Sequence, residues 1–324
     1  MRKLLIIFVL IIALVISILL VKTNVINWPQ PSENKIRIGY IPIADSAQLY
    51  VGIEKGFFKE EGLEIEPISF SGGAKIIEAL ATGSVDIGFS NVVSLILARA
   101  SGLKIVAIAG GPVEDESHKE HAILLRKDSL IKSPKDLEGK TIAINTRKNI
   151  DELFVREYLE KNGVDSSKIK LVEVPFPNME SVLLSGEVDA VASIEPYVTF
   201  ALLHGQTKVL DYNYIALEPR VEISAYVASE DWLQKNKNLA DKFIRAFNKA
   251  TDYALEHEDE VRTIITKYTK LDQKVAQQIV LPTWGKNLTV SELEKMIQKI
   301  YARGWIEKPF DASSIILKNS KMIK

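Results

Sequence analysis

The chain of 324 residues contains no cysteine. This absence excludes disulfide bonds, cysteine-ligated metals, a cysteine nucleophile and a lipid-modified cysteine anchor. The net charge is only −1, with acidic and basic residues mixed along the chain, so the basic surplus of a nucleic-acid-binding protein is missing. A Walker-type phosphate loop and a G-x-S-x-G serine elbow are also missing. We therefore expect neither nucleic-acid binding nor these two kinds of catalytic site.

The N-terminus carries a long apolar run. Arg2 and Lys3 precede Leu4 to Val21, and Lys22 ends the run. As a helix it would be roughly 27 Å long, close to the roughly 30 Å hydrocarbon core of a bilayer. No small-x-small cleavage site follows. We interpret residues 1–22 as a membrane anchor that leaves the rest of the chain extracytoplasmic. A cleaved secretion signal is the alternative, and residues 23–34 read as a linker.

From Lys35 onward, short β-branched runs alternate with amphipathic helical runs. This alternation predicts an α/β protein whose mainly parallel sheets are flanked by helices. The length favours about two domains. We assign residues 35–111 and 213–324 to a first lobe with C-terminal helices, and residues 112–212 to a second lobe. The C-terminal helices should pack on the outside of the first lobe.

The same sequence pattern occurs once in each predicted lobe. ATGSVDIGFSN begins at Ala81, and LSGEVDAVASIE begins at Leu184. Each follows an apolar helical run and places Val-Asp after a glycine. Gly83 and Gly186 are predicted to end their helices in the left-handed conformation, and the Val-Asp pair to begin the next strand. The repeat therefore indicates two similarly built lobes.

Polar residues follow several predicted strands. Ligands of open parallel sheets bind beyond the carboxyl ends of the strands, so these residues are site candidates. At Ser71-Gly72-Gly73, glycines and free helical N–H groups would suit an anion, although a plain strand-to-helix turn has the same sequence. Glu195 could face a cleft, or could be an ordinary carboxylate at a helix N-terminus. Arg147 could neutralise an anion or lie in solvent.

The segment 114–121, EDESHKEH, carries two of the four histidines among several acids. His118 and His121 could contribute to a zinc site, but no third ligand position is evident. We interpret the segment as a solvated connection between the lobes, and we predict no metal and no cofactor.

The stretch from Ile36 to Asn91, with LYVGIEKGFFKEEGLEIE, the SGG helix start and ALATGSVDIGFSN, resembles the nitrate/sulfonate/taurine substrate-binding proteins of ABC importers. AILLRKDSLIKSPKDLEGKTIAI and LLSGEVDAVASIEPY resemble their second lobe. The resemblance runs from about Lys35 to Leu210. It implies a two-lobed type II periplasmic-binding-protein fold with a double crossover, the first crossing near Gly110-Gly111 as hinge and the second between Tyr212 and Ser224. It also implies ligand contacts, which are Asp45, Ser71, Gly72, Gly73, Ser90, Asn91, Asn145, Thr146, Glu195 and Tyr197.

The function implied by the resemblance is capture of a small solute by a monomer that delivers it to an ABC permease with its ATPase. The solute would be sulfonate-, nitrate- or taurine-like, or a related nitrogenous compound. A zwitterion or a pyrimidine-type vitamin precursor would suit both the SGG start and Glu195. Two alternatives stay open: an enzyme of thiamine or menaquinone precursor synthesis on the same fold, and a ligand-binding sensor domain. We expect a binding protein and no enzyme.

Overall fold

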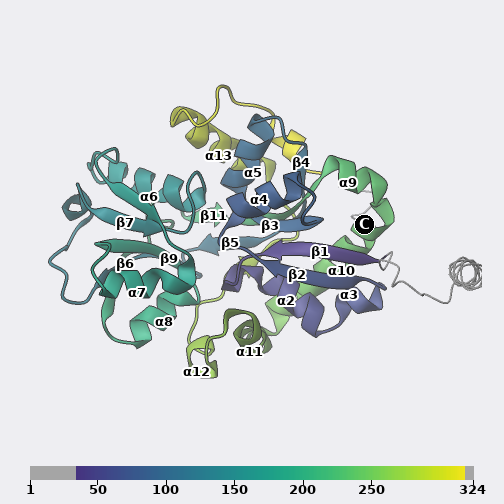
Figure 1. Ribbon diagram of the computed structural model, residues 1–324, viewed down its shortest axis with the longest axis horizontal. Coiled ribbons are helices and arrows are strands. Elements are labelled where there is room, and N and C mark those ends of the chain that lie inside the picture. Colours follow the sequence, from purple (N-terminus) through teal and green to yellow (C-terminus); the bar gives the residue numbers. More distant parts are fainter. Residues whose placement is uncertain (1–33, 318–324) are drawn as a thin grey trace, which may run out of the picture. The chain divides into compact units, whose positions relative to one another are not determined.

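The computed structural model describes residues 34–317, shown as coloured ribbons in Figure 1. The predicted anchor, and all of the predicted linker except Asn34, lie outside these residues. Within residues 34–317, no helix is both long and apolar enough to cross a bilayer.

The first lobe is built on a five-stranded sheet. Its strand order is β2-β1-β3-β12-β4. The strands are β1 (Lys35–Tyr40), β2 (Glu64–Ser69), β3 (Ile87–Asn91), β4 (Ile105–Gly110) and β12 (Ser224–Ser229). β1 and β3 run parallel, whereas β12 runs antiparallel to both β3 and β4. The sheet is therefore mixed.

The second lobe repeats this order. Its sheet is β10-β6-β9-β7-β8, which read from β8 matches the first sheet strand for strand. The strands are β6 (His121–Arg126), β7 (Thr141–Ile144), β8 (Lys170–Glu173), β9 (Ala190–Ile194) and β10 (Thr207–Asp211). β7 runs parallel to β8 and β9, but β6 runs antiparallel to β9 and β10. The prediction of mainly parallel sheets is corrected to two mixed sheets, because β6 and β12 each enter their sheet directly from a crossing strand instead of from a covering helix.

Three short strands form the crossing between the lobes. β5 (Pro112–Asp115) leads into the second lobe, β11 (Arg220–Glu222) leads back, and the two pair antiparallel, with β13 (Thr283–Trp284) beside β5. Gly110 ends β4, and Gly111 stands directly before β5. A Cβ atom on Gly110 would lie 2.7 Å from the Gly285 carbonyl oxygen, and one on Gly111 would lie 2.5 Å from the Ser224 carbonyl oxygen. Both glycines permit close backbone packing at the first crossing, and their role as a hinge stays a prediction.

Helices cover both sheets (Figure 1). Around the first sheet, the 3-10 turn η1 and helices α2 to α5 come from the N-terminal half, and α9 to α11 and α13 from the C-terminal part. Their bounds are η1 (Ala44–Ser46), α2 (Ala47–Glu54), α3 (Phe57–Glu60), α4 (Gly73–Ala81), α5 (Val92–Ala100), α9 (Glu230–Lys235), α10 (Lys237–Glu256), α11 (Glu258–Thr269) and α13 (Val290–Ala302). The second lobe carries α6 (Ile150–Lys161), α7 (Met179–Leu184) and α8 (Tyr197–Leu203), and the short α12 (Gln273–Ala276) contacts α8.

The long helix α10 shows why these helices form. Its apolar residues recur at helical spacing, so that Phe243 and Phe247 are fully buried. Phe243 stacks on Phe58 of α3, with ring centroids 5.4 Å apart, and Phe247 packs on Tyr226 of β12. The spaced aromatic residues of α10 thus belong to the core of the first lobe.

The repeated sequence pattern corresponds to the same local structure in both lobes. Gly83 and Gly186 have φ values of 70° and 79°, so the predicted left-handed helix ends are confirmed. The following aspartates each bind the strand beside them. Asp86 Oδ2 accepts the Arg37 N–H at 2.8 Å, and Asp189 Oδ2 accepts the Thr141 N–H at 2.9 Å. The pattern therefore anchors β3 to β1 and β9 to β7.

Candidate functional site

A small cavity of about 20 Å³ lies where the two lobes meet, with space for roughly one water. Both lobes and the end of the second crossing contribute to its wall. The lining residues are Ile41, Ile43, Asp45, Phe89, Asn91, His121, Asn145, Asn149, Ile150, Asp151, Phe176, Ile194, Ile223 and Ser224. Three of the predicted contacts, Asp45, Asn91 and Asn145, are among them. Residues far apart in the sequence thus share one polar chamber.

A larger pocket of about 240 Å³ adjoins this cavity and shares Ile41, Ile43 and Phe176 with it. Its other lining residues are Pro42, Ser69, Phe70, Ser71, Pro175 and Pro177. The wall is mainly apolar, and Ser71 is the predicted contact that it contains. Together the two spaces form a cleft that consists of a small cavity with polar side chains in its wall and a wider, mainly apolar pocket.

Direct contacts hold the lobes together beside the cleft. The Ala44 N–H donates to the Glu195 carbonyl oxygen at 3.2 Å, and the Tyr197 hydroxyl donates to the Pro42 carbonyl oxygen at 3.0 Å. A Cβ atom on Gly72 would lie 2.7 Å from Thr146 Cγ2. The lobes are therefore closed on each other, and Tyr197 and Thr146 lie at their contact.

The predicted anion site at the start of α4 is partly assembled. Gly72, the N-cap residue, offers no side chain to the first N–H groups of the helix. Ser90 Oγ donates to the Gly73 carbonyl oxygen at 3.2 Å, and Asn91 Oδ1 caps α5 by accepting the Ser94 N–H at 2.9 Å. The Asn91 amide nitrogen lies 2.7 Å from where a Gly73 Cβ would be. The Asn91 side-chain amide thus lies beside the N–H groups of this helix start, and an anionic group would suit it.

Asn145 and its neighbours order the loop after β7. Asn145 Oδ1 accepts the Thr146 N–H at 2.8 Å and the Asn149 side-chain amide at 2.5 Å. Asn149, which caps α6, was not singled out by sequence reasoning, although Asn149 followed by Glu152 is a helix-start pattern. Arg147 donates to the Leu171 carbonyl oxygen at 3.0 Å, which gives it a structural role in the second lobe.

Glu195 is buried at the start of α8. Its carboxylate accepts the Thr199 N–H at 3.2 Å and the Thr199 hydroxyl at 2.7 Å. Burial raises the pKa of Glu195 to about 7, although the bonds from Thr199 oppose the shift. The side chain therefore caps its own helix and does not line either described part of the cleft. Its contact with a ligand stays a prediction.

The two ends of the segment 114–121 differ from the predicted solvated state, whereas Glu116 and Ser117 between them are exposed. Glu114 and Glu120 are fully buried, and His121 is 3% exposed, because the segment runs from the crossing strand β5 into the sheet strand β6. The buried ends of the segment therefore lie where the two lobes meet. The acidic, histidine-containing run was a visible signal, and the sequence analysis placed a connection between the lobes there, but the burial of its ends depends on how the crossing packs between the lobes.

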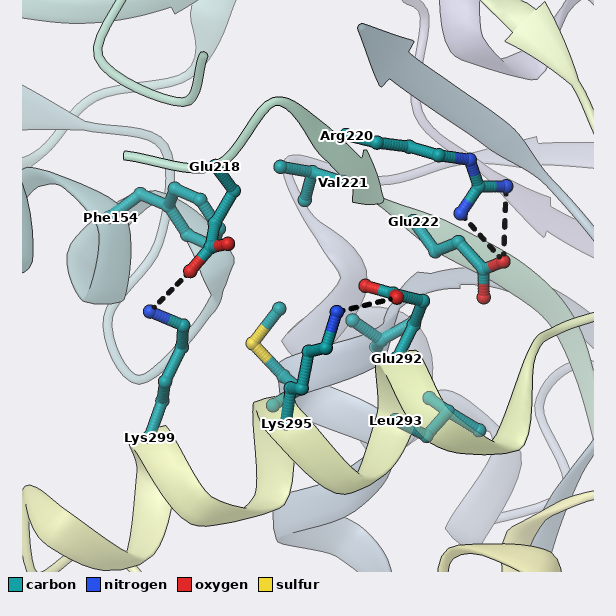
Figure 2. A pocket seen from close by; sticks show the side chains of 11 residues that line it. Phe154, Glu218, Arg220, Val221, Glu222, Glu292, Leu293, Lys295 and Lys299 are labelled. Atoms are coloured by element: carbon teal, nitrogen blue, oxygen red, sulfur yellow. Dashed lines mark hydrogen bonds and ion pairs between the residues drawn. The ribbon is translucent and has the colours of Figure 1, made fainter. Parts of the chain in front are cut away.

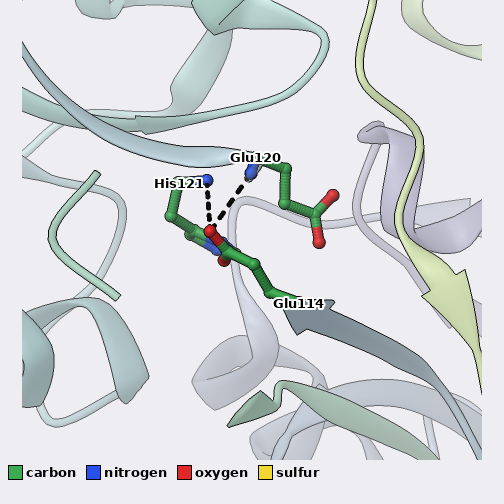
Figure 3. A group of neighbouring side chains, drawn as sticks. All are labelled: Glu114, Glu120 and His121. Carbon is green, nitrogen blue, oxygen red and sulfur yellow. Dashed lines mark hydrogen bonds and ion pairs between the residues drawn. The ribbon is translucent and has the colours of Figure 1, made fainter. Parts of the chain in front are cut away.

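Glu114 and His121 form a buried ion pair, shown in Figure 3. The His121 Nδ1 and Glu114 Oε2 atoms lie 2.6 Å apart, and Glu114 Oε1 accepts the Glu120 N–H at 3.1 Å. Burial alone would lower the pKa of His121, but the Glu114 carboxylate raises it above its usual value. The His121 ring also stacks on Tyr214, whose hydroxyl donates to Asp151 at 2.6 Å. Glu114, Glu120 and His121 could together reach a metal ion.

Asp45 and Glu120 come from different lobes, and each carboxyl group shifts the pKa of the other. Glu195 connects the backbones beside them, since its N–H donates to the Glu120 carbonyl oxygen at 3.1 Å and its own carbonyl oxygen accepts the Ala44 N–H at 3.2 Å. Both are fully buried, and the four carboxyl oxygens have no hydrogen-bond donor among the described residues. A bond between the two carboxyl groups therefore needs a proton on one of them. Burial raises the pKa of Asp45 to about 6 and that of Glu120 well above its usual value. In Figure 3 the Glu120 carboxyl group points away from Glu114.

A separate pocket lies between α13 and the second crossing, outside the cleft (Figure 2). Ion pairs surround it. Lys299 of α13 pairs with Glu218 at 2.9 Å and with Glu157 of α6 at 2.8 Å, and Arg303 pairs with Glu160 of α6 at 2.8 Å. Because α13 packs on α5, these pairs connect the first lobe to the second.

The comparisons with known proteins agree with this architecture. The alkanesulfonate-binding protein SsuA from Xanthomonas axonopodis pv. citri, solved bound to MOPS, matches 89% of this chain and 99% of its own with a TM-score of 0.75 at 18% identity. The formylaminopyrimidine-binding protein of Halalkalibacterium halodurans is 24% identical over 321 residues, 92% of this chain and 95% of the relative. The 4-amino-5-hydroxymethyl-2-methylpyrimidine phosphate synthase of Aspergillus parasiticus is 24% identical over 220 residues, 64% and 63% of the two chains. The NMT1/THI5 like family model matches residues 43–261, most of both lobes, and the chain therefore belongs to this family and has the two-lobed periplasmic-binding-protein fold.

Proposed function

We propose that the chain is the extracytoplasmic solute-binding component of an ABC importer and closes its lobes around a small nitrogenous solute. Its fold is that of solute-binding proteins such as the alkanesulfonate receptor. The observation that carries the proposal is the cleft: polar side chains from both lobes converge on one small cavity beside an apolar pocket. Closure of two lobes by hinge motion is a general means of burying a ligand.

The chemistry of the cleft supports a solute with both an acceptor and an N–H group. The uncapped start of α4, near Asn91, suits an anionic or carbonyl oxygen. The buried acids Asp45 and Glu120 would repel a bare anion such as nitrate. A taurine-like zwitterion or an aminopyrimidine satisfies both ends, and a formylaminopyrimidine is what one relative is named for binding.

A thermal-shift screen of the purified protein tests this proposal. Taurine, methanesulfonate, nitrate and formylaminopyrimidine are the probes. A ligand at 100 times its Kd adds about 2.7 kcal/mol to the free energy of unfolding, which is a measurable rise in Tm. We expect a rise with taurine or formylaminopyrimidine that exceeds that with methanesulfonate or nitrate. A rise with nitrate alone would contradict the proposed chemistry.

Together with the delivery role we propose the partners of the protein and its location. Leu4 to Val21 would hold the receptor at the outer face of the membrane, where an ABC permease and its ATPase accept the solute. The protein would act as a monomer, with lobe 1 at 35–111 and 213–324, lobe 2 at 112–212, and Gly110-Gly111 at the hinge. Recovery of the chain in a washed membrane fraction, and its loss from that fraction when residues 1–22 are deleted, would support the anchor. A sensor would instead require a signalling partner in place of the permease.

An enzyme on the same fold is the second candidate. One relative is a pyrimidine phosphate synthase, and the buried set Asp45, Glu120, Glu114 and His121 offers groups that could exchange protons. Incubation of the protein with formylaminopyrimidine, followed by mass spectrometry, separates the two functions. Recovery of the compound unchanged supports a receptor, and a new product would support an enzyme.

A further inference from the structure

We propose that the small cavity of the cleft is a cation subsite, in which Asp45, which lines the cavity, and the neighbouring buried Glu120 together hold the protonated amine or amidine of the solute. The inference rests on the proposed receptor function, since it concerns the same cleft, and it names the chemical group that the receptor selects. It also assigns Glu120, which no sequence pattern placed in the site.

The two acids come from opposite sides of the closing lobes. Asp45 lies in η1 after β1 of the first lobe, and Glu120 lies directly before β6 of the second. Closure therefore brings together two carboxyl groups that open lobes would hold apart. Two neighbouring carboxylates in a buried site repel strongly unless a positive charge or a proton lies between them. The pair thus opposes closure around a neutral or anionic solute.

The surrounding groups leave this pair without a counter-charge. His121 is engaged by Glu114, and Asp151 accepts the Tyr214 hydroxyl and the Asn149 amide. Glu195, the remaining acid that acts on Glu120, is bonded to Thr199. Of the described residues that line the two parts of the cleft, His121 is the one that can carry a positive charge. Burial raises the pKa of Asp45 and the His121 charge lowers it, but that charge is already paired with Glu114. A neutralising cation must therefore arrive with the solute.

The shape of the cleft favours an organic cation over a metal ion. The small cavity of about 20 Å³ admits a single small group, and it shares walls with the apolar pocket of about 240 Å³ that could hold the body of a solute. A metal would need several fixed ligands. Among residues 34–317, the carboxylate that could join Glu120 and His121 at one ion is Glu114, and both of its oxygens are already bonded to His121 and to backbone N–H groups.

Proton balance gives the subsite a measurable signature. In the empty closed state one proton is shared between Asp45 and Glu120, so the pair carries a single negative charge. When an ammonium group takes the place between the carboxylates, that proton leaves to solvent and the pair carries two negative charges against one positive charge. Protonation and cation binding are thus alternative ways of allowing closure.

Lobe closure can be measured without knowing the natural solute. Because the chain contains no cysteine, Lys75→Cys in the first lobe and Asn178→Cys in the second, both at exposed positions, accept spin labels only there. In the full chain we expect the distance between the labels to be shorter at pH 5 than at pH 8. At pH 8 it should shorten with methylammonium, benzylamine and taurine at concentrations about tenfold lower than with methanol, benzyl alcohol and 2-hydroxyethanesulfonate.

Variants separate this proposal from its rivals. Asp45→Asn and Glu120→Gln should each remove the pH dependence and the tenfold preference for amines. Glu116→Gln, a change of an exposed acid in the same segment, should keep both. An equal response to amine and alcohol partners, or an unaltered preference in Asp45→Asn, would overturn the subsite. Closure driven by Zn²⁺ or Mn²⁺ alone, with no response to amines, would also overturn it in favour of a metal site.

The proposed receptor function and the proposed cation subsite can be contradicted independently of each other. Closure by formylaminopyrimidine or 2-hydroxyethanesulfonate without an amine preference leaves a receptor but removes the cation subsite. Closure by low pH and by simple ammonium ions, with no response to taurine or formylaminopyrimidine, retains the acid pair and argues against the proposed solutes.

Discussion

Asp45 combines full burial with a carboxyl group that no donor in the described chain satisfies. Its pKa is raised to about 6, mainly by burial, so the folded protein binds a proton more tightly than the unfolded chain does. Stability from this group is fully present below the unfolded pKa, near 4, and is lost as the pH rises through 6. A shift of this size costs about 3 kcal/mol above pH 7.

Substitution of Asp45 by asparagine should remove this loss. The free energy of unfolding of Asp45→Asn, relative to the original protein, should rise by up to about 3 kcal/mol between pH 4 and pH 8. Urea unfolding at both pH values measures the change. A difference between the two proteins that stays constant with pH would show that Asp45 does not titrate in this range.

His121 and Glu114 are both buried, so water does not weaken their ion pair as it would weaken an exposed one. Glu114→Gln would leave a buried imidazolium without its partner, which costs about 3–5 kcal/mol or forces the ring to lose its proton. We expect the pKa of His121 to fall. Stability gained from the pair is present below the unfolded histidine pKa and is lost as the pH rises through the raised folded value. A proton NMR titration of the His121 ring in both proteins measures the shift. An unchanged titration would contradict the pairing.

At the scale of elements, the start of α4 meets the loop that follows β7. Gly72 can stand there because it has no Cβ atom, which would lie 2.7 Å from Thr146 Cγ2 and 2.8 Å from Thr146 Oγ1. The backbone of Gly72 is extended, so the restriction on this position comes from the opposite lobe. The start of α4 and the loop after β7 each form within their own lobe. How closely the two can pack determines whether the lobes can close.

The variant Gly72→Ala should therefore impair closure more than folding. We expect solute affinity to fall about tenfold or more, while the free energy of unfolding changes by less than about 1 kcal/mol. The double variant Gly72→Ala with Thr146→Ala removes both close atoms and should recover most of the affinity. Calorimetric titration with the best solute of the screen measures this. Equal affinities in all three proteins would mean that the closed contact does not form around the solute.

At the scale of the molecule, α13 connects the lobes on the side of the second crossing. Lys299 pairs with Glu157 and Glu218, and Arg303 pairs with Glu160. Lys299 keeps 25% of its side-chain surface exposed and Glu157 keeps 16%, so their pair is only partly screened by salt. These pairs should stabilise the arrangement of the lobes seen here.

Removal of the Lys299 charge should shift the protein toward open lobes. For Lys299→Ala we expect a several-fold increase in the open population, since partly exposed pairs contribute up to about 1 kcal/mol. The distance between labels at positions 75 and 178 measures it. Lys295→Ala is the matched control, because Lys295 pairs with Glu292 within the same helix and does not reach the second lobe. An equal effect of both variants would exclude a connection through Lys299.

Much of this organisation can be predicted from the sequence by itself. Gly83 and Gly186 end helices, and Asp86 and Asp189 stand at equivalent places in the two lobes. The sequence predicts both features because helix ends and strand starts depend on neighbouring residues. The polar residues Asp45, Asn91 and Asn145 follow strands, and their meeting at one cavity follows from the sheet topology.

Only the tertiary structure decided the rest. β6 and β12 run antiparallel because the chain reaches each of them through a crossing strand, which no local pattern marks. The same crossing buries Glu114, Glu120 and His121, whose composition alone is typical of a solvated segment. The local sequence determines which residues can carry a charge. The opposing lobe determines whether such a residue is surrounded by water or lies beside another carboxyl group. The pairing of Asp45 with Glu120 was therefore determined by the fold.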